Sequence, residues 1–261
     1  VEIDPWSRDM RVDALAAAMA ADRDADRLPA IVVASAGSTG TTAFDPISEI
    51  VSAAAAHGAW VHVDAAMAGA ALVLPEMRHL FAGTEGADSL SWNPHKWFGT
   101  ILDCSLMYLR DPDHLIRVMS TNPSYLRSTA GGEATQYRDW GIPLGRRFRA
   151  LKLWLVIRHY GVEGLRHHVR RHVELAREFV RMVEADPEFE LAAPAPLNLV
   201  CFRHRGGDER NQEILDTVNG SGQIFLTHTK IDGKLTLRMS IGQARTEARH
   251  VRRAWDLISS S

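Results

Sequence analysis

The chain has 261 residues and a net charge of −2, with 46% hydrophobic and 24% charged residues. This balance is ordinary for a folded domain and gives no sign of a nucleic-acid-binding surface. Its two cysteines, Cys104 and Cys201, argue against a disulfide framework and favour a reducing compartment, so we expect a cytoplasmic location. The first residues lack a signal-peptide pattern, and charged and histidine side chains interrupt the apolar run at 53–75, which argues against a membrane span.

The hydrophobic pattern of the first part of the chain predicts strands that alternate with helices. The expected elements, in chain order, are a helix at 12–21, a strand at 30–35, a helix at 46–57, a strand at 60–64, a helix at 75–82, and strands at 89–92 and 105–110. Such alternation is typical of an α/β fold with a mostly parallel sheet.

The pattern fails between residues 116 and 143, where Asn122-Pro123 and Gly131-Gly132 mark an irregular segment. A loop of this length inside a compact domain is usually functional or mobile, so we expect the segment 119–137 to be mobile. Beyond it we expect helices at 144–159 and 162–185, an Ala/Pro linker at 192–196, strands at 197–203, 223–228 and 234–241, and helices at 208–218 and 246–259. We therefore predict a large domain at 1–172 and a small α+β domain at 173–261.

A lysine and an aspartate stand at the exits of two predicted strands. Asp64 ends the strand at 60–64, and Lys96 follows the strand at 89–92 within Asn93-Pro94-His95-Lys96-Trp97. A pyridoxal 5′-phosphate (PLP) site needs an amine for the aldehyde and an anion for the ring nitrogen, and this pair supplies both. The small residues Ala65 and Ala66 suit a flat group nearby. The alternatives are a surface lysine and a helix N-cap.

Four other residues are candidates for the same site. His95 is placed to contact a phosphate or position a substrate, although a structural histidine is the alternative. Asn93 either donates to the phosphate or shapes the turn before the proline. Ser38 lies in a turn of glycines and hydroxyl residues at 37–42 that follows the strand at 30–35, but this turn lacks the lysine of a P-loop. Tyr125 lies in the long loop and is either a proton donor or a packed tyrosine. The histidines show no metal-binding spacing.

Several motifs, in the same order along the chain, resemble the group II PLP-dependent decarboxylases, and among them the aromatic-L-amino-acid decarboxylases. They are His62-Val63-Asp64-Ala65-Ala66, Pro75-Glu76-Met77-Arg78-His79-Leu80, Asn93-Pro94-His95-Lys96-Trp97, Asp103-Cys104-Ser105, Tyr137-Arg138-Asp139-Trp140, the run from Ile142 to Arg149, and Leu235-Thr236-Leu237-Arg238. The resemblance covers essentially the whole chain.

The resemblance implies a fold-type I PLP-dependent transferase, aspartate-aminotransferase-like, with part of the large domain and a small C-terminal α+β domain. The roles that it implies are a covalent link to PLP for Lys96, the ring-nitrogen partner for Asp64, a ring contact for Ala66, a phosphate neighbour for Asn93, a place beside cofactor and substrate for His95, a cofactor contact for Ser38, and proton delivery to the reacting carbon for Tyr125. The implied activity is decarboxylation of an L-amino acid, with an aromatic one as the expected substrate.

Some features depart from the family pattern. The family usually has threonine at the position of Ser38, and animal enzymes have phenylalanine at that of Leu102. The match begins partway into the large domain, so we expect a C-terminal portion that lacks most of the phosphate-binding turn and the histidine that stacks on the ring. The expected partners are an amino-acid substrate, a second copy in a homodimer, and a separate N-terminal half. The alternatives are an aromatic aldehyde synthase, an acidic or diamino-acid decarboxylase, and a catalytically incomplete assembly subunit.

Overall fold

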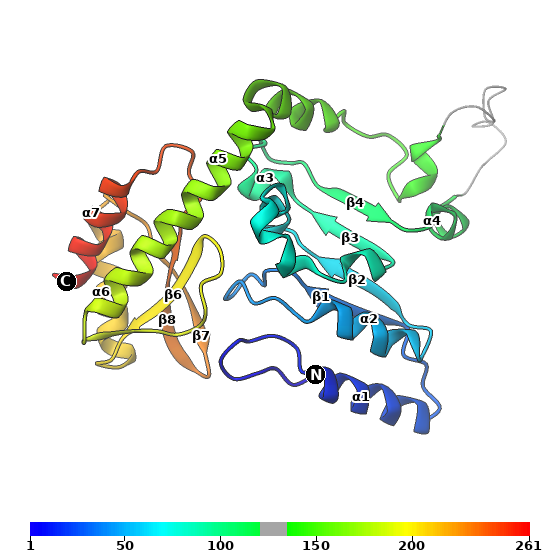
Figure 1. Ribbon diagram of the computed structural model, residues 1–261, viewed down its shortest axis with the longest axis horizontal. Coiled ribbons are helices and arrows are strands. Elements are labelled where there is room, and N and C mark those ends of the chain that lie inside the picture. The colour runs from blue at the N-terminus through cyan, green and yellow to red at the C-terminus, as the bar shows by residue number, and fades with distance from the viewer. Residues whose placement is uncertain (121–134) are drawn as a thin grey trace.

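The computed structural model of the protein describes residues 1–120 and 135–261. Tyr125 and most of the predicted loop at 119–137 lie outside these residues. The described chain forms two four-stranded sheets, one in an N-terminal lobe and one in a C-terminal lobe, and a long helix runs from the first lobe into the second (Figure 1).

The first sheet consists of β1 (Ile31–Ser35), β2 (Trp60–Asp64), β3 (Ser89–Trp92) and β4 (Leu106–Leu109), in that order. β1, β2 and β3 are parallel, as predicted, and β4 is antiparallel to β3. The register places Ser35 opposite Asp64, and Asp64 opposite Ser91. The carboxyl ends of the three parallel strands therefore meet at one edge.

One face of this sheet is buried and the other is largely bare. Alternate side chains of β1 and β2 pack against the helix α2, whereas Ile31 and Val33 on the opposite face are 58% and 48% exposed. The described helices of this lobe are α1 (Val12–Asp24), α2 (Ile47–Ala55), α3 (Pro94–Trp97) and α4 (Pro112–Met119), with described 3₁₀ helices at Ala68–Val73, Pro75–Phe81, Thr84–Gly86 and Tyr137–Trp140. The predicted helix at 75–82 is thus a 3₁₀ helix.

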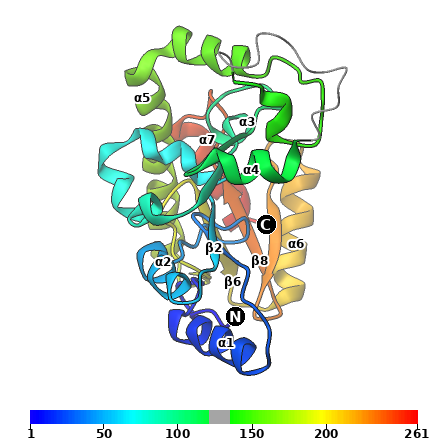
Figure 2. The same ribbon diagram turned by 90° about the vertical axis from the view of Figure 1, so that its right-hand side faces the viewer.

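The helix α5 (Ala150–Ala185) is the longest element and contributes to both cores. Gly161 interrupts it with φ 64° and ψ 173°, so it comprises two helical segments, as predicted. The first segment begins at Ala150 rather than at residue 144. Gly145 is a poor helix former, and the residues around it are exposed and have little packing to stabilise a helix. After the break, α5 contacts the 3₁₀ helix at Ala68–Val73 in the first lobe and then runs along the second sheet (Figures 1 and 2). The predicted boundary between residues 172 and 173 falls within α5 and stays a prediction.

The second sheet is antiparallel throughout, in the order β5-β6-β8-β7. Its strands are β5 (Phe189–Leu191), β6 (Leu199–His204), β7 (Thr227–Ile231) and β8 (Lys234–Ser240), and its remaining helices are α6 (Asp208–Gly220) and α7 (Ala248–Ser259). Val200 and Phe202 of β6 face the core that α5, α6 and α7 build. The predicted strand at 223–228 is wrong in position, since β7 begins at Thr227.

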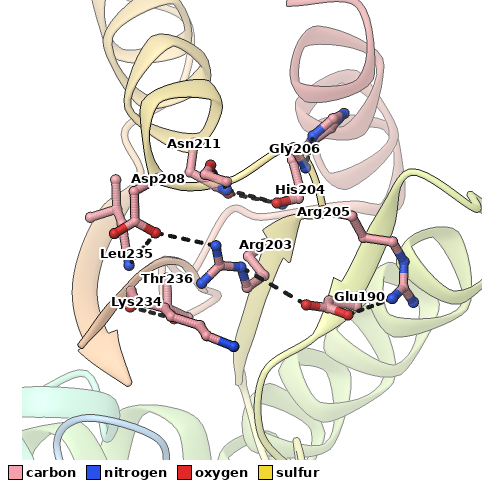
Figure 3. Close-up of polar contacts among 11 residues, drawn as sticks. Glu190, Arg203, His204, Arg205, Gly206, Asp208, Asn211, Lys234, Leu235 and Thr236 are labelled. Carbon is pink, nitrogen blue, oxygen red and sulfur yellow. Dashed lines mark hydrogen bonds and ion pairs between the residues drawn. The ribbon is translucent and has the colours of Figure 1, made fainter. Parts of the chain in front are cut away.

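A polar cluster holds the turn between β6 and α6 (Figure 3). The fully buried Asn211 donates from Nδ2 to the carbonyl oxygens of His204 (2.8 Å) and Gly207 (2.7 Å), and its Oδ1 accepts the His204 N–H at 2.8 Å. Beside it, the buried Arg203 lies between two carboxylates, with Nη2 3.2 Å from Asp208 and Nε 3.9 Å from Glu190. The strand pairing of the backbone stops at the end of β6, and the Asn211 side chain supplies hydrogen bonds to the backbone groups there.

Contacts between the lobes fix the turn that follows β1. Arg238 of β8 donates from Nε to the Gly40 carbonyl oxygen at 3.0 Å, and the Cys201 thiol of β6 reaches the same oxygen at 3.4 Å. Burial raises the pKa of Cys201 to about 11, so this residue remains a thiol. Arg8 and Asp232 form a second connection, with an ion pair at 2.6 Å. Within the described ranges, no helix is long and apolar enough to cross a membrane.

Candidate active site

The predicted site residues follow the carboxyl ends of neighbouring parallel strands. The Ala36 N–H, just after β1, donates to the Asp64 carbonyl at 2.8 Å, and the Asn93 N–H, just after β3, donates to the Ala66 carbonyl at 2.9 Å. These backbone bonds bring the segments after β1, β2 and β3 together at the sheet edge where open α/β sheets bind ligands.

Asp64 presents a carboxylate oxygen at this edge. Its Oδ1 accepts the Ala66 N–H at 2.9 Å and lies 3.4 Å from the Ser91 hydroxyl. No described residue bonds to Oδ2. The next helix begins at Ala68 with Met67 at its N-cap, so Asp64 is not a helix cap. The contacts fix the carboxylate and leave one oxygen for a cationic group.

Lys96 lies exposed on the one-turn helix α3, between side chains that anchor it. Pro94 and Trp97 are buried, and the Lys96 N–H donates to the Asn93 carbonyl at 2.9 Å. Among the residues that the structure describes, none makes a hydrogen bond or ion pair with the Lys96 amine. An exposed lysine is ordinary in itself, but this one is set at the exit of a strand on a short, anchored helix.

His95 bonds through Nδ1 to the segment before β4. Nδ1 is 2.6 Å from the Cys104 carbonyl oxygen and 3.0 Å from its amide nitrogen. The carbonyl contact needs a proton on Nδ1, whereas the Cys104 N–H donates to a lone pair on Nδ1, so the two contacts call for opposite tautomers. In either tautomer Nε2 has no partner in the described part of the chain. One side of the ring is fixed, and the other remains available to a ligand.

Ser38 and Asn93 are held by local bonds. The Ser38 hydroxyl lies 3.2 Å from that of Thr41 and accepts the Ala43 N–H at 3.1 Å. Asn93 accepts a hydrogen bond from the Ser105 hydroxyl through Oδ1, which leaves its Nδ2 group as a donor. The structure therefore places both residues at the edge, with Ser38 committed to its own turn.

Glycine is required at the start of that turn. Gly37 has φ 85°, and a Cβ built there would lie 2.4 Å from the Cβ of Ala68. A side chain at this position would force apart the segments that follow β1 and β2.

The strand β2 carries a second titratable group close to the site. His62 stands two residues before Asp64 and bonds through Nδ1 to the Ser89 hydroxyl at 2.7 Å. Burial lowers the pKa of His62, and the nearby Asp64 carboxylate opposes this shift. A neutral His62 leaves the Asp64 carboxylate available for another cation.

Sequence reasoning gave no role to the supporting residues Ser91, Cys104 and Ser105. Ser91 bonds to Asp64, Cys104 to His95, and Ser105 to Asn93. The alternation of side chains along a strand could have indicated Ser91, because a residue two positions before Asn93 points to the same face. The other two bonds depend on how the chain returns after α3, and no local pattern reveals that.

The residues at this edge fit the reactive parts of PLP. An amine and a carboxylate oxygen without described partners stand beside the small residues Ala65 and Ala66, which leave room for a flat ring. Lys96 would hold the aldehyde carbon, and Asp64 would hold the proton on the ring nitrogen. Within the described residues, no group of histidine, cysteine and acidic side chains is arranged to hold a metal ion.

Known proteins resemble this chain in sequence and in fold. The sequence profile of the pyridoxal-dependent decarboxylase conserved domain matches residues 2–205. Phenylacetaldehyde synthase of Arabidopsis thaliana is 44% identical over 258 residues, which are 95% of this chain and 53% of that protein. Aromatic-L-amino-acid decarboxylase of Drosophila melanogaster is 44% identical over 252 residues, 97% of this chain and 49% of that protein. The crystal structure of Oryza sativa TDC with PLP and tryptamine superposes with a TM-score of 0.95 at 41% identity, covering 97% of this chain and 55% of that one.

The chain belongs to the family of pyridoxal-dependent decarboxylases. This confirms the resemblance and the fold-type I architecture expected from the sequence. PLP is the cofactor of this family. The chain spans about half the length of the curated relatives that it matches.

Proposed function

We propose that the protein is a PLP-dependent decarboxylase that converts an aromatic L-amino acid into its amine and carbon dioxide. The observation that supports this function is the pair formed by the Lys96 amine and the Asp64 carboxylate. Both stand at one sheet edge without full partners, in a chain of the pyridoxal-dependent decarboxylase family. The aromatic substrate class is supported by the relatives, which include an aromatic-L-amino-acid decarboxylase.

Each site residue has a proposed task. When bound, PLP supplies an electron sink for the pair released as the Cα–carboxylate bond breaks. Lys96 holds the cofactor covalently and yields its place to the substrate amine. The Asp64 carboxylate keeps a proton on the ring nitrogen, and Ala66 leaves room for the ring. His95 positions the substrate through Nε2.

Three further roles come from the resemblance to the family. Asn93 and Ser38 are proposed as polar neighbours of the cofactor, with the Asn93 Nδ2 group as a donor. Tyr125, outside the described residues, is proposed to deliver a proton to the carbon that loses the carboxylate.

The cofactor link is tested by borohydride reduction of the purified protein followed by peptide mapping. The pyridoxyl label is expected on Lys96, and Lys96→Ala should abolish it together with the yellow chromophore. A label on Lys152, Lys230 or Lys234 would show that the assignment is wrong. A protein with no chromophore and no product would instead be an incomplete assembly subunit.

The substrate class is tested with a panel of aromatic, acidic and diamino acids, by identifying the amine product of each. Release of amine and carbon dioxide from aromatic amino acids alone is the expected result. Turnover of an acidic or diamino acid in preference to aromatic ones would overturn the proposed substrate class.

An aromatic aldehyde synthase is the second candidate, because the phenylacetaldehyde synthase relative is as similar as the decarboxylase. Tyr125 favours simple decarboxylation, since related aldehyde synthases often carry phenylalanine there. Measurement of aldehyde, ammonia and hydrogen peroxide under oxygen separates the two. Tyr125→Phe should reduce the amine and raise the aldehyde, and unchanged amine output without aldehyde would remove the proton-donor role.

We propose a homodimer in the cytoplasm as the working form. Apolar side chains left exposed before and within the first segment of α5, such as Phe148 at 74% and Trp154 at 56%, support a further interface. The use of just two cysteines, both free and buried, supports a reducing location. A separate chain carrying the N-terminal half stays a prediction. Sedimentation analysis of the purified protein would decide the oligomeric state.

A further inference from the structure

A buried histidine connects the helix that carries Lys96 to the C-terminal lobe. The indole Nε1 of Trp97 lies 3.0 Å from Nδ1 of His172 on α5, and Nε2 of the same imidazole lies 3.1 Å from the Gln243 carbonyl oxygen. Trp97 and His172 are each 2% exposed, and their rings are nearly parallel, with an interplanar angle of 20°.

The two bonds fix the protonation state of His172. The Trp97 Nε1–H group only donates, so Nδ1 of His172 must carry a lone pair. The Gln243 carbonyl oxygen only accepts, so Nε2 must carry the proton. These bonds require the neutral Nε2–H tautomer, since an additional proton on Nδ1 would point at the indole N–H.

The charges around His172 favour this neutral form. Burial lowers its pKa to about 4, and the neighbouring His168, whose ring centroid is 4.4 Å away, acts in the same direction. The hydrogen bond to the Gln243 carbonyl raises the pKa of His172, and the nearby Arg171 charge lowers it. Arg245, from the loop before α7, faces the same space, a cavity of about 490 Å³ that also borders His167 and His168. Among the described residues, no carboxylate lines this cavity, so His172 stays neutral in the physiological pH range.

The bridge matters because α3 cannot hold its own orientation. A helix of one turn has too few internal hydrogen bonds to be stable, so tertiary contacts decide where it points. Lys96 immediately precedes Trp97 in α3, and its amine has no described partner that would fix it. Gln243 lies two residues after Ile241, which is buried in the second core and holds this segment in the C-terminal lobe. The imidazole thus connects the lysine-bearing turn to the packing of the C-terminal lobe.

We propose that His172 is a positioning residue that fixes the direction of Lys96 by bridging the Trp97 indole to the Gln243 backbone carbonyl. The inference rests on the proposed function of Lys96. It adds that the C-terminal lobe contributes to the geometry of the cofactor-binding lysine through the neutral side chain of His172.

The first test is nitrogen NMR of the purified protein without cofactor, with labelled histidine. The His172 signals are expected to show the neutral Nε2–H tautomer at neutral pH. A charged imidazolium, or a proton on Nδ1, would overturn the proposal. This result does not depend on activity, so it stands or fails separately from the proposed function.

The second test compares variants by hydrogen exchange and kinetics. His172→Phe keeps a ring but removes both bonds, and it is expected to speed exchange in the peptide 94–100 about tenfold or more. His167→Phe, at an exposed position of the same helix, is the matched control and should change nothing. His172→Asn keeps an acceptor near the Nδ1 position, so exchange should rise mainly in the peptide 241–247.

In the holoenzyme, His172→Phe should lower kcat about tenfold and speed the loss of cofactor, with KM changed less than about twofold. Unchanged exchange at 94–100, or faster exchange with unaltered kcat and cofactor retention, would overturn the positioning role. If the pyridoxyl label falls on a lysine other than Lys96 while the tautomer is as expected, the proposed function fails and the bridge remains a structural contact.

Discussion

Replacing Asn211 tests how the C-terminal lobe closes the turn between β6 and α6. Its side chain makes three hydrogen bonds in a fully buried site, to His204 N, His204 O and Gly207 O. Each such bond contributes about 1 kcal/mol net, and a buried partner left unpaired adds to the loss. Asn211→Ala should therefore lower the free energy of unfolding by about 3 kcal/mol.

The isosteric Asn211→Asp variant separates hydrogen bonding from packing. One carboxylate oxygen can still accept the His204 N–H, but the other would face two carbonyl oxygens, and a charge would be buried. We expect a loss of about 3–5 kcal/mol at neutral pH, at least as large as that of Asn211→Ala. Burial would raise the pKa of the new carboxyl group, so stability should recover as the pH falls and the group becomes a donor.

The assay is urea unfolding combined with hydrogen exchange of the β6 peptide at 199–204. Trp255 packs on Phe179 and Phe189 in the second core, so its fluorescence reports on this lobe. Gln212→Ala, on the exposed side of α6, is the control and should cost less than about 0.5 kcal/mol. An Asn211→Asp variant more stable than Asn211→Ala at neutral pH would refute the hydrogen-bond reasoning.

Three further changes have expected outcomes. Asp64→Asn should retain cofactor, because an amide oxygen can still accept the Ala66 N–H, but slow decarboxylation on the order of 100-fold; near-normal turnover would remove its proposed role. The pKa of His172 is lowered from 6.5 to about 4, so its contribution to stability is present above pH 6.5 and is lost as the pH falls towards 4. The free energy of unfolding should fall by about 3 kcal/mol over this pH range because of His172. The difference in free energy of unfolding between wild type and His172→Phe measures this loss. A difference that does not change with pH would argue against it. Arg203→Met should destabilise the C-terminal lobe by about 1–3 kcal/mol, because Asp208 and Glu190 lose their cation while remaining partly solvated. A thermal midpoint within 1 °C of wild type, roughly 0.3–0.5 kcal/mol, would contradict this.

The parallel strands of the first sheet were predictable because their signals are local. β2 and β3 have the predicted bounds, and β1 starts one residue later than predicted. Each is a short apolar run that ends at a polar turn. The site residues Asp64 and Lys96 could be placed for the same reason, because their positions at strand exits follow from the chain order of a parallel sheet.

The edge strands of the second sheet were harder to predict. The predicted strand at 223–228 includes the apolar pair Ile224-Phe225, yet Phe225 is 78% exposed. β7 instead uses the polar sequence from Thr227 to Ile231, because it pairs with β8 alone and has little to bury. The Asp232-Gly233 turn, with φ 50° and 78°, was a usable hairpin signal.

Long-range bonds at the site had no sequence signal. His172 lies 75 residues from Trp97, and Arg238 lies 198 residues from Gly40. Such pairs depend on how the two lobes pack, and one sequence without that packing does not reveal them.

The shared helix α5 limits how this chain can change length during evolution. Leu165, Val169 and Val173 pack in the first core, while Leu175 and Phe179 pack in the second. One inserted residue between the two groups would turn one apolar face by about 100° relative to the other and move it by about 1.5 Å. Both cores would then lose their fit at once. Insertions and deletions should therefore collect in the loops of related sequences and be absent from the stretch between residues 165 and 179.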